Sequence, residues 1–157
     1  MTMEQQQSER GLVVVSESGV GRYGQQVRAG RHELAADEPG PVGADSGPNP
    51  YDLLLAALGS CTSMTVRMYA ERKGWPLEKV TVALRHERVH AEDCAECESG
   101  HGLVDRITRE IRLDGALDAE QRRRLLDIAE KCPVHRTLTA GVVVSTAEVP
   151  PEAAARG

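Results

Sequence analysis

The stretch GPNPYDLLLAALGSCTSMTVRMYAERKG, residues 47–74, decides the fold of this chain. No proline interrupts it between Tyr51 and Lys73, and mostly apolar residues recur at steps of three and four, as on one face of a helix. The residues of this face are Leu54, Leu58, Cys61, Thr65 and Met68. The first four turns are apolar nearly all round, which predicts that a sheet or another subunit surrounds the helix.

The ends of this helix are also marked in the sequence. Asn49 fits the N-cap, and Pro50 fits the first helical position, where no N–H donor is needed. Asp52 falls in the first turn, where the helix dipole favours a negative charge. Gly74 and Pro76 predict the end of the helix.

The segment before the helix contains β-prone residues and then turn residues. Residues 11–34, GLVVVSESGVGRYGQQVRAGRHEL, hold short apolar runs and predict a β-meander with turns near Gly21 and Gly30. Residues 35–50 are rich in glycine and proline, which predicts a loop between the meander and the helix.

The segment after the helix shows strand and helix patterns in turn. Residues 80–92 and 103–113 alternate apolar and polar side chains, as half-buried strands do, and a cysteine-rich segment connects them. A second helix is predicted from Asp118 to Lys131, and residues 140–149 are predicted to close as a strand. The order is β-β-β-α-β-β-α-β, with a hairpin on either side of the buried helix, so the predicted fold class is α+β.

Length and composition set the size of the core. Polar tails, residues 1–10 and 149–157, flank a single predicted domain over residues 11–148. The chain has 157 residues and no phenylalanine, so its core is modest. Such a chain gains buried area from a partner, which favours an oligomer.

Charge and hydropathy exclude several classes of partner. The net charge of −5 argues against binding to nucleic acid or to an anionic membrane, because both need a basic face. The polar N-terminus does not resemble a signal peptide, and no apolar run reaches the roughly 18 residues of a spanning helix. We therefore expect a cytoplasmic protein whose four cysteines are reduced unless they bind metal or perform redox chemistry.

Cys61 lies in the middle of the long apolar helix. A thiol in such a helix is usually inert core, because burial raises its pKa. Small neighbours, however, leave room beside this sulfur, where a helix packed only for stability would carry leucine. These neighbours are Ala56, Ala57, Gly59 and Ser60. These residues are compatible with two interpretations of Cys61, an inert core thiol and a reactive thiol.

Cys132 lies in KCPVHRTL, residues 131–138. Pro133 fits the first position of a short helix, which would make Cys132 its N-cap and favour a thiolate. Positive charge from Lys131, His135 and Arg136 acts in the same direction. The alternative is that Cys132 marks a break between two helices and packs inward.

Cys94 and Cys97 form a CAEC motif with His90 and His101 nearby. These four residues are a candidate zinc site, although strong zinc signals have two spaced ligand pairs. A redox pair is a second reading and a structural role a third. The acidic residues of this loop raise thiol pKa values and disfavour nucleophilic use.

The order of these motifs resembles a known family. The helix over residues 47–74, a strand pair, then KCPVHRTL and a final GVVVS strand resemble the OsmC/Ohr proteins, the osmotically inducible and organic hydroperoxide resistance proteins. The resemblance covers most of residues 12–147. It implies an intertwined homodimer whose central helices are buried between β-sheets, with two sites at the subunit interface.

The resemblance also implies an activity. It makes the protein a cysteine peroxidase without metal or haem, with Cys61 as the peroxidatic and Cys132 as the resolving cysteine. The implied substrates are bulky organic hydroperoxides, often of fatty acids. The implied reductant is a dithiol, such as a lipoylated or thioredoxin-like protein. This chemistry passes through a sulfenic acid and a disulfide.

One position departs from the family pattern. The family supplies an Arg from the N-terminal sheet, held by a Glu in an NPE triplet, whereas this chain has NPY with Tyr51 in the place of Glu. Asp52 is the acid nearest to that position, about 100° further around the helix. Arg22 is the expected cation. Arg28 and Arg31 are its alternatives.

Two hypotheses follow from these observations. The first is a thiol-dependent hydroperoxide reductase that uses Cys61, Cys132, Arg22 and Asp52. The second, which Tyr51 motivates, is a non-catalytic or altered small-molecule or metal-binding dimer. In that case zinc would bind at the CAEC loop.

Overall fold

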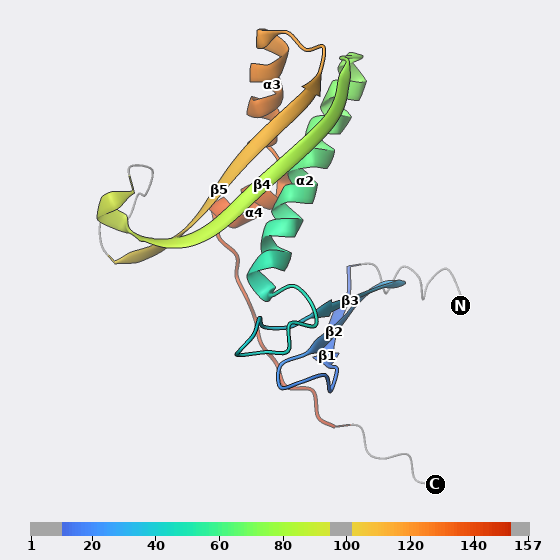
Figure 1. Cartoon of the computed structure of the whole chain (residues 1–157), viewed down its shortest axis with the longest axis vertical. Helices are drawn as coiled ribbons and strands as arrows, with labels where there is room; N and C mark the ends of the chain where they lie inside the picture. The colour runs from blue at the N-terminus through green and yellow to red at the C-terminus, as the bar shows by residue number, and fades with distance from the viewer. Residues whose placement is uncertain (1–10, 95–101, 152–157) are drawn as a thin grey trace.

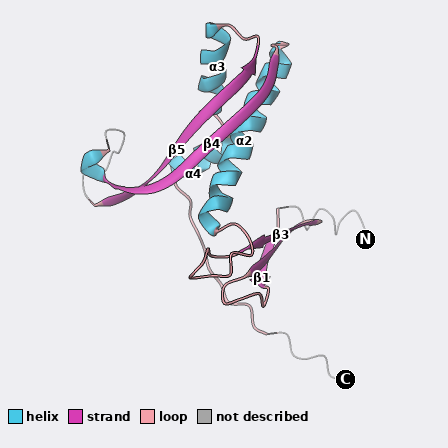
Figure 2. Cartoon of the chain, in the orientation of Figure 1, coloured by secondary structure: helices cyan, strands magenta, loops and turns pink. Residues whose placement is uncertain are grey.

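The computed structural model describes residues 11–94 and 102–151. The helices and strands form a three-stranded sheet, a long two-stranded hairpin and three α-helices (Figure 1). The two sheets are separate, and the long helix α2 leads from the smaller sheet along the hairpin (Figure 2). The predicted α+β class is confirmed.

The three-stranded sheet is the predicted meander. Strands β1 (Val13–Glu17), β2 (Gln25–Ala29) and β3 (His32–Ala36) pair antiparallel in chain order. Val15 lies opposite Val27, and Val27 opposite Leu34. All five residues of β1 remain exposed, so an apolar strand of this sheet is left without a covering layer.

Helix α2 (Pro50–Lys73) begins and ends where the sequence predicts. The Asn49 side chain accepts a hydrogen bond from the Asp52 amide at 2.9 Å, and the Asp52 carboxylate accepts one from the Asn49 amide at 3.1 Å. This capping box satisfies two N–H groups at the start of the helix. Gly74 ends it in the left-handed conformation, with φ of 65°, which favours glycine.

The hairpin consists of β4 (Leu77–His90) and β5 (Leu103–Gly115), which pair antiparallel along nearly their whole length. A short 3₁₀ helix, η1 (Ala91–Asp93), follows β4. Helix α2 runs along the hairpin (Figure 1). Because side chains alternate along a strand, every second residue of β4 and β5 turns away from solvent.

The core lies where α2, the hairpin and α3 (Ala119–Ala129) meet. Asp118 caps α3 through a second capping box with Gln121, as the sequence predicted for this helix start. Small and branched aliphatic side chains fill the core, as a chain without phenylalanine requires. They are Val66, Ala70, Leu77, Leu113, Leu117, Leu125 and Ala129.

The chain after α3 differs from the prediction in one respect. Helix α4 (Pro133–Ala140) forms, with Cys132 as its N-cap, but the strand predicted over residues 140–149 does not. A strand needs a neighbour for its ladder of hydrogen bonds, and residues 141–151 pair with no strand of the described chain. Val143, for example, is 93% exposed.

A further expectation, that no segment is apolar enough to span a membrane, was wrong for α2. By length and composition alone this helix passes the test for a membrane span. The core helices of soluble proteins pass the same test. Here α2 packs along β4, α3 and α4, but only 28% of its most apolar window is buried within the described chain.

Candidate functional site

The fold brings Cys61 and Cys132 together. Cys61 lies in the middle of α2 and Cys132 at the N-cap of α4, and α2 packs against α4. Neither thiol is in a disulfide. Their side chains interact closely enough that each shifts the pKa of the other. Cys61 is half-buried and Cys132 is fully buried.

The two thiols differ in which form they favour. Burial raises the pKa of the Cys61 thiol, and the neighbouring Cys132 sulfur raises it further. Burial acts to raise the pKa of Cys132 too, but the Cys61 thiol, the His135 amide and the Thr62 hydroxyl outweigh it, so this pKa lies below its usual value. When the pair carries one proton, these opposite shifts favour the proton on Cys61 and the negative charge on Cys132.

The position of Cys132 explains this preference. Pro133 occupies the first turn of α4, and the next amides, those of Val134 and His135, favour a charged Cys132. Both amides favour the charged sulfur as backbone hydrogen-bond donors, at the end of the helix where the dipole also favours negative charge.

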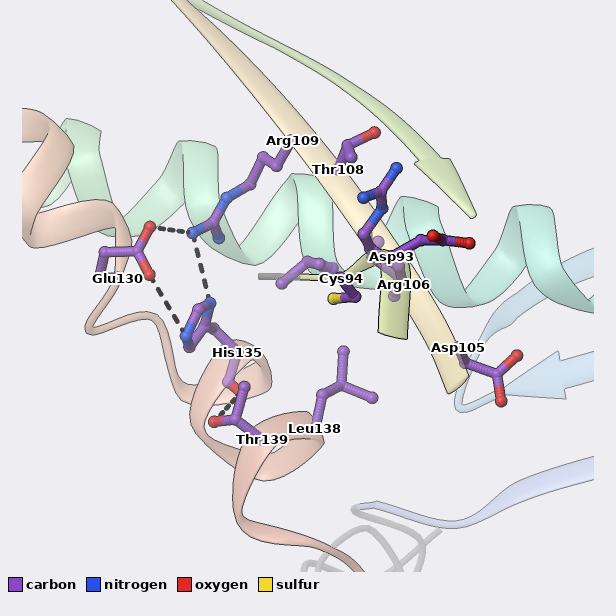
Figure 3. A pocket seen from close by; sticks show the side chains of 12 residues that line it. Asp93, Cys94, Asp105, Arg106, Thr108, Arg109, Glu130, His135, Leu138 and Thr139 are labelled. Atoms are coloured by element: carbon purple, nitrogen blue, oxygen red, sulfur yellow. Dashed lines mark hydrogen bonds and ion pairs between the residues drawn. The ribbon is translucent and has the colours of Figure 1, made fainter. Parts of the chain in front are cut away.

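A network of charged side chains joins β5 to the residues on either side of Cys132 (Figure 3). Arg109 of β5 donates to the Thr62 hydroxyl at 2.9 Å, to the Glu130 carboxylate at 2.9 Å and to His135 Nδ1 at 3.3 Å. Glu130 Oε2 lies 3.4 Å from His135 Nε2, which closes the network. Only 9% of the Arg109 side chain is exposed.

Arg109, Glu130 and Thr62 were not among the site residues predicted from the sequence. A signal was present for Arg109, because it occupies an inward position of an alternating strand whose other inward residues include Ile111 and Leu113. An arginine on the buried face of a strand needs partners and therefore marks a candidate site.

Arg109, Glu130 and His135 also border a cavity of about 970 Å³ (Figure 3). Arg109, Glu130 and His135 lie on one side of it, with Asp93 and Cys94 at η1 on another. Its lining is mixed, with charged groups of both signs beside Leu58 and Leu138.

The sequence-predicted residues around Tyr51 make other contacts in this chain. The Tyr51 ring stacks on the ring of His86, with centroids 4.2 Å apart, and the Asp52 carboxylate belongs to the capping box of α2. The Arg22 guanidinium lies 5.5 Å from the centroid of the Tyr23 ring. A role for Arg22 or Asp52 at Cys61 stays a prediction.

The two alternatives to Arg22, Arg28 and Arg31, belong to the same small sheet. Arg28 lies on β2, opposite Glu33 of β3, and Arg31 lies in the turn between these strands. Both are exposed. Their role stays a prediction as well.

The predicted zinc site lies partly outside the described residues, which do not include Cys97 and His101. Cys94 is buried and disulfide-bonded, and His90 is exposed at the end of β4. Over residues 11–94 and 102–151, no three His, Cys, Asp or Glu side chains lie close enough to hold a metal ion. Zinc binding at the CAEC loop stays a prediction, and it would require this disulfide to be reduced.

Comparison with known proteins assigns the family. The sequence pattern of the OsmC-like protein family matches residues 43–147, which include both free cysteines and the whole of α2. The chain belongs to the OsmC-like family. No curated protein sequence matches it.

Solved structures of OsmC-like proteins share this fold. An OsmC-like protein from Mycoplasma pneumoniae has a TM-score of 0.65 at 17% identity, over 82% of this chain and 86% of that one. An organic hydroperoxide resistance protein, OsmC, from Legionella pneumophila has a TM-score of 0.56 at 20% identity, over 80% and 87%. One from Elizabethkingia anophelis has a TM-score of 0.57 at 17% identity, over 80% and 86%. The resemblance to the OsmC/Ohr family that the motifs indicated is confirmed.

Proposed function

We propose that this OsmC-like protein is a thiol-dependent peroxidase that reduces organic hydroperoxides. The observation that carries the proposal is the pairing of a half-buried Cys61 with a buried Cys132, whose side chains lie close enough to interact. Two thiols in contact, one of them accessible, are what a sulfenic acid and its resolution into a disulfide require. Relatives called organic hydroperoxide resistance proteins support the same reading.

The proposed reaction begins with the pair holding one proton. As the hydroperoxide approaches, the proton of Cys61 passes to Cys132, and the Cys61 sulfur attacks the distal oxygen. The O–O bond breaks, Cys61 becomes a sulfenic acid, and the leaving alkoxide takes the proton from Cys132 to become an alcohol. The Cys132 thiolate then attacks the Cys61 sulfur and releases hydroxide, which forms the disulfide.

The surroundings of Cys61 suit an apolar hydroperoxide of the fatty-acid type. On a helix, residues three, four and seven positions away share a face with Cys61. Ala57, Met64 and Met68 occupy such positions and are exposed. An apolar chain lying along this face would bring its hydroperoxide group to Cys61.

A homodimer is part of the proposal. The apolar strand β1 and the valines at 142–144 are exposed in the single chain, and a second copy would cover such surfaces. The proposed reductant is a dithiol, such as a lipoylated or thioredoxin-like protein, which would restore the thiols by exchange. The proposed location is the cytoplasm, where such reductants act. The reaction needs no cofactor, nucleic acid or membrane.

The pH dependence of the reaction tests the proposal. Because the pKa of Cys132 is lowered, the singly charged pair forms below the pH at which a free cysteine, with a pKa of about 8.5, ionises. The second-order rate constant of the reduced protein with cumene hydroperoxide, measured by stopped flow, should rise with pH and reach half its plateau below about 8.5. No consumption at any pH, or a midpoint above that of free cysteine, contradicts the proposal.

The second hypothesis is favoured by Tyr51, which stacks on His86 in the place of the family's glutamate. If the protein is a binding dimer, the reduced protein leaves hydroperoxide unchanged. Elemental analysis then finds stoichiometric zinc, which Cys94→Ser removes. Peroxide consumption without zinc supports the peroxidase instead.

A further inference from the structure

A buried arginine of β5, Arg109, contacts residues next to both thiols. The Arg109 side chain extends from β5 and is almost fully buried, between α2 on one side and the junction of α3 and α4 on the other. Burial of a guanidinium is costly unless its donors are satisfied, and here its two terminal nitrogens meet Thr62, Glu130 and His135.

The partners of Arg109 adjoin the two thiols in sequence and in space. Thr62 follows Cys61 on α2, Glu130 precedes Cys132 by two residues, and His135 lies in the first turn of α4. Arg109 therefore joins the three elements that hold Cys61 and Cys132 in contact.

Thr62 connects the arginine to the sulfur. A hydroxyl has one hydrogen to donate and two lone pairs to accept with. Arg109 donates to Thr62 Oγ1, so the single hydroxyl hydrogen is directed away from the arginine. It is donated either to the Leu58 carbonyl, 2.7 Å away, or to the Cys132 sulfur, whose charged form this hydroxyl favours.

We propose that Arg109 is a positioning residue for the thiol pair: held by Glu130 and His135, it acts through Thr62 to keep the negative charge on the Cys132 sulfur. Glu130 has two opposed effects. It orients Arg109, and its own charge partly offsets that of the arginine.

Several charged groups lie around the thiol pair and in the neighbouring cavity. Those near the thiols are Arg109 from β5, Glu130 after α3 and His135 from α4, with Asp93, Asp105 and Arg106 further along the cavity. Arg106 is paired with Glu87, and Asp105 with His86. The Arg109 and Glu130 charges are the ones linked to Thr62 or to the helix of Cys132.

The test is a titration of thiolate absorbance in the reduced full-length protein, with Cys132→Ser as the background to subtract. Arg109→Met is expected to raise the midpoint of thiolate formation by about one pH unit. At a pH below the midpoint, about tenfold less thiolate is then present. Glu130→Gln keeps an acceptor for Arg109 but removes the opposing charge, so it is expected to lower the midpoint. Arg109→Lys keeps the charge and is expected to restore most of the loss.

A matched pair on the same strand gives the control. Arg112 and Asp114 form an exposed ion pair on β5, so Arg112→Met and Asp114→Asn should leave the midpoint unchanged. An unchanged midpoint in Arg109→Met, or shifts of the same sign in Arg109→Met and Glu130→Gln, would overturn the proposal. If circular dichroism shows that Arg109→Met is unfolded, Arg109→Lys and Glu130→Gln decide it.

This inference rests on the proposed thiol chemistry, yet the two can fail separately. The titration uses no peroxide. A protein that shows the expected shifts but consumes no hydroperoxide refutes the peroxidase and leaves the role of Arg109 intact. One that consumes hydroperoxide with an unshifted titration does the reverse.

Discussion

Replacement of Cys61 by serine is expected to reduce the rate of cumene hydroperoxide consumption by roughly 1,000-fold or more, as loss of a nucleophile does in other enzymes. Serine occupies nearly the same volume, but its hydroxyl is a weak nucleophile that forms no sulfenic acid. Stopped-flow measurement with the reduced protein under single-turnover conditions gives the rate.

Cys132→Ser is the matched control for that experiment. This variant keeps the accessible thiol of Cys61 but removes the group that resolves it. It should consume about one equivalent of hydroperoxide and then stop, because the sulfenic acid of Cys61 has no Cys132 thiol to resolve it. The same is expected with a dithiol present if that dithiol reacts only slowly with the sulfenic acid. Equal rates in Cys61→Ser and the unmodified protein would show that the chemistry lies elsewhere.

The second large effect concerns stability. Leu125 of α3 is fully buried in the core, among Val66, Ala70 and Ala129. Leu125→Ala is expected to lower the free energy of unfolding by about 3 kcal/mol, because the side chain's burial is lost and a cavity remains. Urea denaturation followed by circular dichroism measures the change.

Leu126, the next residue of the same helix, provides the comparison. It is 45% exposed, so Leu126→Ala should change the free energy of unfolding by about 0.5 kcal/mol or less. Equal losses in the two variants would mean that α3 is not packed on α2 as described. Since α3 leads directly to Glu130 and Cys132, the packing of Leu125 also supports the site.

The parts of the fold that local sequence encodes were predictable. Asn49, Asp52 and Gly74 mark the ends of α2 because capping depends on neighbours in the chain. The alternation of β4 and β5 and the cap of α3 at Asp118 are local in the same way. Pro133 likewise indicated a new helix with Cys132 at its N-cap.

The contacts of the site could not be derived from spacing. Cys61 and Cys132 belong to helices far apart in the chain, and only the packing of α2 on α4 places their sulfurs in contact. The motifs together suggested the pair through a family resemblance. Arg109 was missed because its partners come from α2, α4 and the end of α3, which the strand pattern does not name.

The missing last strand has a similar cause. The valines at 142–144 have high β-propensity, but a strand forms only when it pairs with another strand, and these residues pair with none in the described chain. Strand β1 of the small sheet is likewise exposed and has no covering layer. The β-propensity of residues 142–144 therefore identified a segment suited to strand pairing. Whether it forms a strand depends on a neighbouring strand, which its own sequence does not specify.

The most direct test of the account is the covalent product of one turnover. Reduced protein is treated with one equivalent of cumene hydroperoxide without a reductant, and its peptides are mapped by mass spectrometry. The account predicts a disulfide between Cys61 and Cys132 and one equivalent of the alcohol. Two unmodified thiols, or a disulfide that joins either of them to another cysteine, would contradict it.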